Sequence, residues 1–177
     1  MDASVLYFLI SWLLAAVFAV AAWHKVGAWP RFKASLAAYR LLPGAAVAVV
    51  GAGLAIAELV AVILLCLSAT QQVGLMMAMG LLSVYAGAIG VSVMRGRTEI
   101  DCGCGDEPTP VSMTLVFRNV LLIALAGFAM SEPAAAIAWP VALVAGGLTL
   151  VAYGLYSSIE QLIANRARHR RLWLGAS

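Results

Sequence analysis

Apolar residues fill most of this chain and fall into five long runs separated by short polar segments. The runs cover residues 5–23, 44–69, 73–94, 112–130 and 134–157. A helix rises about 1.5 Å per residue, so about 20 apolar residues match a bilayer core of about 30 Å. Each run is long enough to cross a membrane, and the pattern predicts five transmembrane helices.

The composition indicates the same class of protein. Hydrophobic residues make up 64% of the 177 residues, charged residues 11%, and the mean hydropathy is +0.99. Soluble domains carry about 25% charged residues. We therefore expect an all-α integral membrane bundle, with one transmembrane domain over residues 1–177 and a basic tail at 158–177. The first run has no basic segment before it and no convincing cleavage site after it, so we expect a mature helix rather than a secretory signal.

The polar connection after the first run, residues 24–43, has a helical pattern of its own. Pro30 suits the first turn of a helix. Apolar residues then recur at helical spacing with cations between them: Trp29, Phe32, Leu36 and Tyr39 against Arg31, Lys33 and Arg40. This pattern predicts a short amphipathic helix at the membrane interface. Two roles stay open for it: anchoring at the level of the lipid headgroups, and gating or docking of a partner.

Cations are distributed unevenly among the connections. They lie in the first connection, in the third and in the tail: Lys25, Arg31, Lys33 and Arg40, then Arg95 and Arg97, then Arg166, Arg168, Arg170 and Arg171. The N-terminus and the turns at 70–72 and 131–133 have none. Because cytoplasmic loops are enriched in Lys and Arg, the distribution predicts an external N-terminus and a cytoplasmic C-terminus. The third connection is then cytoplasmic. Thiols on that side suggest electron entry from a reduced cytosolic donor, whereas thiols on the outside would suggest direct exchange with a periplasmic thioredoxin-like partner.

That third connection contains Cys102-Gly103-Cys104-Gly105. Two thiols one residue apart can close a small strained disulfide, and strained disulfides are the labile and catalytic kind. Gly103 and Gly105 free the backbone for the tight geometry of such a ring. A metal site is a second interpretation, but two thiolates without a nearby His or third Cys leave a tetrahedral site half filled. The motif favours thiol redox chemistry, with metal binding and incidental cysteines as alternatives.

Glu58 is the most prominent polar residue within the apolar runs. A carboxylate near the middle of a span costs about 3 kcal/mol or more unless it is paired or protonated. We expect Glu58 to face the bundle interior, either neutral or paired with Arg118. A proton relay and a structural hydrogen bond between helices are both open as its role.

Other polar residues have weaker signals. Ser112 is the expected N-cap of the fourth run. Arg118 and Asn119 follow two turns later, and Arg118 either extends to the interface or holds a thiolate of the loop or the Glu58 carboxylate. Cys66 is either a small apolar residue or a relay thiol nearer the outer face. Tyr39 and Arg40 could cover the cysteine loop from the short helix.

Several of these segments together resemble a known family. Lys25-Val26, Tyr39-Arg40-Leu41-Leu42-Pro43, Glu58, Cys102-Gly103-Cys104-Gly105 and Arg118-Asn119 are similar to the methylamine utilisation protein MauE family, in the wider DoxX-like group, over residues 12–125. The family usually has an aromatic residue between the second Cys and the next Gly, which this chain lacks. The resemblance implies a bacterial inner-membrane protein that works with a thioredoxin-like periplasmic partner, MauD. Their client is an exported disulfide-rich protein, the small subunit of methylamine dehydrogenase.

From the residues and the resemblance we expect thiol-disulfide exchange at Cys102 and Cys104, with Glu58 handling protons and Arg118 stabilising charge. Beyond the redox-active Cys102–Cys104 disulfide this chemistry requires no cofactor, and quinone involvement stays open. The expected partners are membrane lipid, the thioredoxin-like protein and its client, and nothing indicates nucleic acid. The alternatives are a non-catalytic membrane scaffold for the partner and client, and a small metal-handling transporter.

Overall fold

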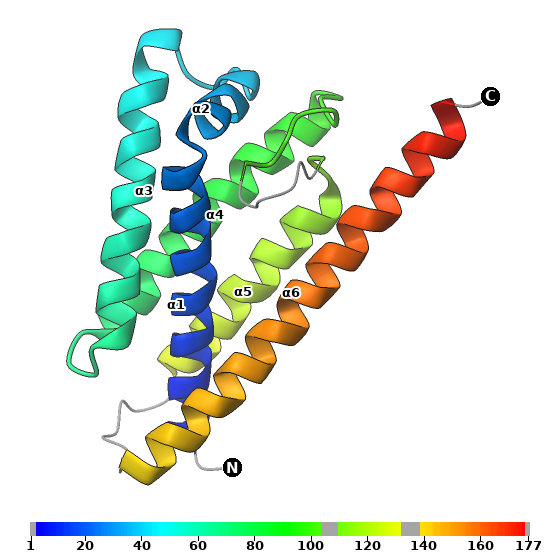
Figure 1. Ribbon diagram of the computed structural model, residues 1–177. Coiled ribbons are helices and arrows are strands. Elements are labelled where there is room, and N and C mark those ends of the chain that lie inside the picture. The colour runs from blue at the N-terminus through cyan, green and yellow to red at the C-terminus, as the bar shows by residue number, and fades with distance from the viewer. Residues whose placement is uncertain (1–2, 104–109, 132–138, 176–177) are drawn as a thin grey trace.

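The computed structural model describes residues 3–103, 110–131 and 139–175, and these form an all-α bundle (Figure 1). The helices are α1 (Ala3–Gly27), α2 (Trp29–Ala38), α3 (Gly44–Cys66), α4 (Gln71–Met94), α5 (Met113–Met130) and α6 (Trp139–Gly175). Within the described residues, five of them are long and apolar enough to cross a membrane. The predicted five spans are confirmed, and so is the short helix after the first.

Most helix boundaries differ from the predicted runs by a few residues, and three of the differences concern polar or terminal segments. Helix α1 continues to Gly27, so it includes Lys25, which the sequence pattern had assigned to the connection. Helix α3 ends at Cys66, three residues earlier than the apolar run. Helix α6 continues to Gly175, through the basic tail.

Helix α1 lies at the centre of the bundle and packs against α3, α5 and α6, while α4 packs against α3 and α5 (Figure 1). Their inward faces share one apolar core, which includes Tyr7, Leu14, Phe18, Leu65, Leu75, Ala78, Leu82, Leu122 and Ala126. Outward-facing residues of the same helices are mostly apolar and exposed. This is the pattern of a bundle whose outer surface contacts lipid.

Small residues allow two close approaches between helices. A Cβ added at Gly74 would lie 2.8 Å from the backbone nitrogen of Leu65, so α3 and α4 nearly touch where they meet. At the other end of α3, Gly51 leaves room for the rings of Trp29 and Phe32, and α2 lies across it. Both contacts depend on a glycine at the helix surface, as is usual where transmembrane helices approach closely.

The chain alternates between the two ends of the bundle (Figure 1). Helix α2, the connection from α4 to α5 and the C-terminal end of α6 lie at one end, whereas the N-terminus and the turn from α3 to α4 lie at the other. Because the cation-rich segments share an end, the arrangement agrees with the charge pattern. Which end faces the cytoplasm stays a prediction.

Candidate functional site

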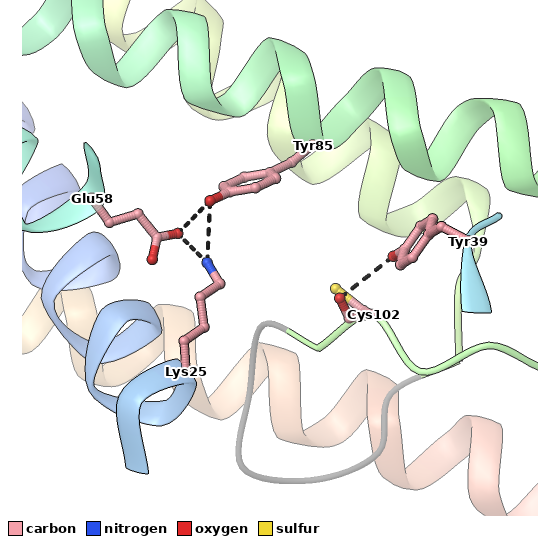
Figure 2. Close-up of polar contacts among 5 residues, drawn as sticks. All are labelled: Lys25, Tyr39, Glu58, Tyr85 and Cys102. Atoms are coloured by element: carbon pink, nitrogen blue, oxygen red, sulfur yellow. Dashed lines mark hydrogen bonds and ion pairs between the residues drawn. The ribbon is translucent and has the colours of Figure 1, made fainter. Parts of the chain in front are cut away.

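A buried cluster of three polar side chains joins α1, α3 and α4 (Figure 2). Lys25 Nζ forms an ion pair with Glu58 Oε1 and also donates to the Tyr85 hydroxyl at 3.2 Å. That hydroxyl donates in turn to Glu58 Oε1 at 2.6 Å. Lys25 is 1% exposed and Glu58 0%. Pairing offsets the large cost of removing two charges from water.

The sequence positions these side chains through ordinary helical periodicity. Glu58 lies on the buried face of α3, together with Val47, Gly51, Ala55, Ala61 and Leu65. Lys25 continues a buried stripe of α1 that includes Phe18 and Ala22, at spacings of four and three residues. Its Nζ also lies over the Tyr85 ring, 4.7 Å from the ring centre, which adds a favourable cation–π contact.

Two states are expected for Glu58 from the sequence, neutral or paired with Arg118. The pairing with Arg118 is wrong, because Lys25 is the cation that Glu58 meets. Glu58 does face the interior, as predicted. Lys25 was missed because it follows Trp23 and His24 and looks like a cation at a helix exit. The signal that could have found it is its place on the Phe18 and Ala22 stripe.

A second cluster surrounds Cys102. Its side chain is only 8% exposed and packs with Tyr39, Ile89, Val111 and Leu115. The Tyr39 hydroxyl donates to the Cys102 carbonyl oxygen at 3.4 Å (Figure 2). An isolated β-bridge between Asp101 and Pro110 joins the two sides of the connection next to it, and the Val111 N–H donates to the Ile100 carbonyl at 3.0 Å. Cys102 is therefore held at a defined position against α2, α4 and α5.

Helix α2 holds this connection in place through an ion pair and a close contact. Arg31 donates to Asp101 Oδ2 from Nε at 3.2 Å and from Nη2 at 3.0 Å. The other oxygen of Asp101 accepts the Gly103 N–H at 3.2 Å. Gly103 has φ +73°, and a Cβ there would lie 3.1 Å from the Cβ of Ser35. Both the backbone conformation and the contact with α2 require glycine at this position.

One cavity of about 180 Å³ connects the two clusters. Lys25 and Tyr85 line it on one side, Cys102 and Tyr39 on the other. The remaining wall is apolar: Phe32, Leu36, Leu41, Leu42, Val50, Leu54, Val84, Ala88 and Ile89. The Cys102 thiol and the buried ionic cluster thus face the same cavity, although Lys25 and Cys102 are 77 residues apart in sequence.

The sequence profile described as "Methylamine utilisation protein MauE" matches residues 3–132, a range that contains both clusters. This chain belongs to the MauE family. It is 38% identical to the methylamine utilization protein MauE of Paracoccus versutus over 169 residues, which cover 91% of each chain. Its identity to the MauE of Paracoccus denitrificans is 34% over 147 residues, 79% of each chain. No solved structure matches significantly.

A third relative, the MauE of Methylophilus methylotrophus, is 37% identical over 120 residues, 68% of this chain and 63% of that protein. The family match ends at residue 132 and leaves out α6, which begins at Trp139. The MauE family core is thus the part of the bundle that contains the ionic cluster, helix α2 and the cysteine connection. Helix α6 packs against the outside of α1.

The other residues predicted from the sequence are not among the described residues that line this cavity. Arg40 is exposed and has φ +49°, so it turns the chain after α2 while Tyr39 points inward. Arg118 is half-buried in α5, and Asn119 beside it is completely buried. Ser112 is the N-cap of α5 by position, but its side chain makes no capping hydrogen bond. Cys104 and Gly105 lie outside the described residues.

Cys66 does not join the site. It is exposed at the end of α3, 12 residues after Leu54, the last α3 residue of the cavity wall. At 1.5 Å per residue that is about 18 Å along the helix. A disulfide requires sulfur atoms about 2 Å apart, so Cys66 and Cys102 cannot exchange directly in this arrangement.

Proposed function

We propose that this MauE family protein performs thiol-disulfide exchange in the membrane through Cys102 and Cys104. The observation that carries the proposal is the cavity that Cys102 shares with the Lys25–Glu58–Tyr85 cluster. A thiol pair that cycles between dithiol and disulfide must lose and regain two protons along with two electrons. A buried group of ionisable side chains facing the same cavity can accept those protons and return them.

Exchange with a partner follows the usual chemistry of thiols. One thiolate of the pair attacks a disulfide sulfur of the partner, and the partner's other sulfur leaves as a thiolate. The second thiolate of the pair then attacks the mixed disulfide and closes Cys102–Cys104. The partner ends with two thiols and has gained two electrons, and the protons lost by the pair balance those that it takes up. The reverse sequence reduces the pair.

The three members of the cluster have different roles in this proposal. Glu58 and Tyr85 share a short hydrogen bond along which a proton can shift between carboxylate and hydroxyl oxygens. Lys25 stabilises the negative charge left on either oxygen. Helix α2 and Tyr39 after it cover Cys102, and Arg31 holds the neighbouring Asp101. Exchange therefore requires α2 to move away from Cys102 when the partner docks. Arg118 retains its predicted role in stabilising a loop thiolate.

We further propose that the pathway is the one in the relatives' names, methylamine utilisation. The partner is then a thioredoxin-like protein of the MauD kind, and the client an exported protein with several disulfides. The membrane is the bacterial inner membrane, with the N-terminus outside and the C-terminus in the cytoplasm. In this orientation the cysteine connection faces the cytoplasm, where a reduced thioredoxin-like donor exchanges with the pair. Direct exchange with a periplasmic partner requires the opposite orientation. The alternation of the chain between the two ends of the bundle supports a multi-pass arrangement with the termini on opposite sides.

One observation favours a second candidate, a non-catalytic scaffold that binds partner and client. Cys102 is covered by α2, and a thiol that attacks a partner's disulfide must be reached by it. A scaffold needs no such access. In that case Arg31 and Tyr39 hold the connection in a shape that a partner recognises, and the thiols contribute to folding alone.

Trapping the thiols in cells separates the two candidates. Cells that depend on the protein for client maturation are quenched with acid and alkylated, in wild type and in Cys102→Ser, Cys104→Ser and Cys66→Ser variants. Exchange predicts a reversible Cys102–Cys104 disulfide, a mixed disulfide with the partner in one single Ser variant, and normal maturation with Cys66→Ser. Full maturation in both Cys102→Ser and Cys104→Ser would leave the scaffold as the function.

A further inference from the structure

We infer that the cavity between α2, α3 and α4 binds the ring of a membrane quinone, which accepts electrons from the Cys102–Cys104 pair. This inference rests on the proposed exchange at that pair and adds its electron acceptor. The supporting observations are the chemistry of the cavity wall, the hydrogen-bonding capacity of Lys25 and the side on which the cavity opens.

The wall suits a flat, mostly apolar ring with a polar edge. Nine of the described wall residues are apolar, including Phe32, and Tyr39 and Tyr85 add two more aromatic rings. The polar groups, Lys25 and Tyr85, come from one side. Binding sites for small molecules combine an apolar lining with a few convergent polar groups in this way. Nucleotide or flavin phosphates would need several donors or cations here, and Lys25 is the single cation among the described residues that line the cavity.

Lys25 has the capacity to bind a quinone oxygen. An ammonium group carries three N–H donors, and two of them go to Glu58 and Tyr85. The third has no acceptor among the described residues, and Lys25 lines the cavity. A quinone carbonyl gains negative charge as the ring is reduced, so a nearby ammonium binds the reduced form more tightly than the oxidised one. Glu58 and Tyr85 then relay a proton to the same oxygen.

The opening of the cavity favours a ligand that arrives from lipid. Two of its wall residues, Leu41 and Val84, are also 42% and 57% exposed on the outer surface. In a transmembrane bundle that surface contacts hydrocarbon chains. A ring entering between α2, α3 and α4 can leave an isoprenoid tail in the bilayer. A water-soluble acceptor would have to cross apolar surface to reach the same place.

The electron transfer balances with one quinone for each cysteine pair. The two thiols lose two electrons and two protons as the Cys102–Cys104 bond forms. The quinone gains both electrons and both protons, so its two carbonyl groups become the two hydroxyls of a quinol. A thioredoxin-like protein on the side of the membrane that the cysteine connection faces, carrying two thiols, then reduces the pair again. The net direction is oxidation of that protein's thiols by the quinone pool.

Two neighbouring residues of α3 provide a matched test. Val50 lines the cavity, whereas Val49 is 74% exposed on the outer surface and is not part of the wall. Val50→Trp fills the cavity, and Val49→Trp adds the same side chain to the lipid-facing side. Ala88→Leu fills the cavity from the opposite wall, on α4. It provides a second cavity-filling variant if Val50→Trp does not fold.

The purified full-length protein is placed in lipid nanodiscs, reduced with dithiothreitol, desalted and mixed with ubiquinone carrying one isoprene unit. Quinol formation and thiol loss are followed together. We expect one quinol per Cys102–Cys104 pair in wild type and Val49→Trp, and rates lower by about tenfold or more in Val50→Trp and Ala88→Leu. A photoreactive azidoquinone should label wall residues in the wild-type protein independently of turnover.

Oxidised glutathione, applied to the same samples, separates failure of this inference from failure of the proposed function. If glutathione closes the cysteine pair but the quinone does not, the quinone site is overturned and exchange stands. The same holds if Val50→Trp and Ala88→Leu react with quinone at the wild-type rate. Azidoquinone labelling confined to residues outside the wall would also overturn it and leave a lipid chain as the occupant. If neither oxidant closes the pair, the proposed exchange itself fails.

Discussion

The ion pair between Lys25 and Glu58 is buried in the bundle. Both residues are buried among apolar side chains, where an unpaired charge is strongly unfavourable. Removing one partner of a buried pair typically costs about 3–5 kcal/mol, whereas replacing both by neutral residues is often close to neutral. A conservative change of Glu58 alone therefore cannot separate a structural role from a proton-transfer role.

A double-mutant cycle makes that separation. We expect Lys25→Met and Glu58→Gln each to lower the free energy of unfolding by about 3–5 kcal/mol, and the double variant to recover most of the loss. Denaturant unfolding of the purified protein measures this. If the cluster handles protons, the stable double variant still fails to support client maturation in cells.

The control is Lys33→Met, which removes a half-buried lysine of α2 that forms no ion pair with a described residue. It should change stability by no more than about 0.5 kcal/mol. Equal stability of both single variants and the wild type would contradict the buried ion pair. Normal maturation with the double variant would leave the cluster a structural role only.

At the scale of elements, the fold depends on close contact between α3 and α4 at the end opposite the cysteine connection. Gln71 Nε2 donates to the Leu65 carbonyl at 3.0 Å, and Thr70 Oγ1 donates to the Leu64 carbonyl at 3.0 Å. Gly74 permits this approach because a side chain there would meet the α3 backbone. The contact sets the position of Glu58 relative to Tyr85, since each lies on one of these helices.

Gly74→Ala should therefore destabilise the protein and disturb the ionic cluster. The added methyl group meets backbone atoms that cannot rotate away, so we expect a loss of about 1–3 kcal/mol. Gly80→Ala, also in α4 but with no atom near its Cβ position, should be neutral or stabilising by up to about 1 kcal/mol, because Ala favours helix over Gly. Thermal unfolding of both variants tests the pair. Equal stability of the two would show that α3 and α4 are further apart.

At the scale of the whole molecule, the cations and the cysteine connection share one end of the bundle (Figure 1). Lys25 is an exception to the charge pattern, because its charge is neutralised within the bundle and does not meet lipid headgroups. Arg31, Arg40, Arg95 and Arg97 remain at that end, so the positive-inside rule still favours a cytoplasmic location for it.

Single reporter cysteines in a cysteine-free chain test this orientation. Thr98→Cys marks the cysteine connection, and Ser68→Cys marks the turn from α3 to α4; both positions are exposed. In intact cells an impermeant thiol reagent should label Ser68→Cys, and Thr98→Cys only after the membrane is permeabilised. The opposite labelling pattern would show that the orientation is inverted. The cysteine connection would then lie outside, where a periplasmic partner could reach it directly.

Local properties of the sequence were sufficient for much of this structure. Apolar length determined the five spans, and Pro30 followed by a helical repeat determined α2, because both depend on neighbours within one segment. The cost of a carboxylate in lipid placed Glu58 in the interior. Gly103 was recognised as a residue whose backbone freedom mattered, and its φ of +73° agrees.

Tertiary structure alone decided which residues meet. Glu58 pairs with Lys25, α2 closes over Cys102, and one cavity joins the two clusters, because helices distant in sequence cross at particular depths and rotations. Those crossings depend on close approaches such as the one at Gly74, which is set by the combined packing of two helices. A periodic pattern specifies which face of a helix is buried, but the partner of that face is a non-local property of the packed bundle.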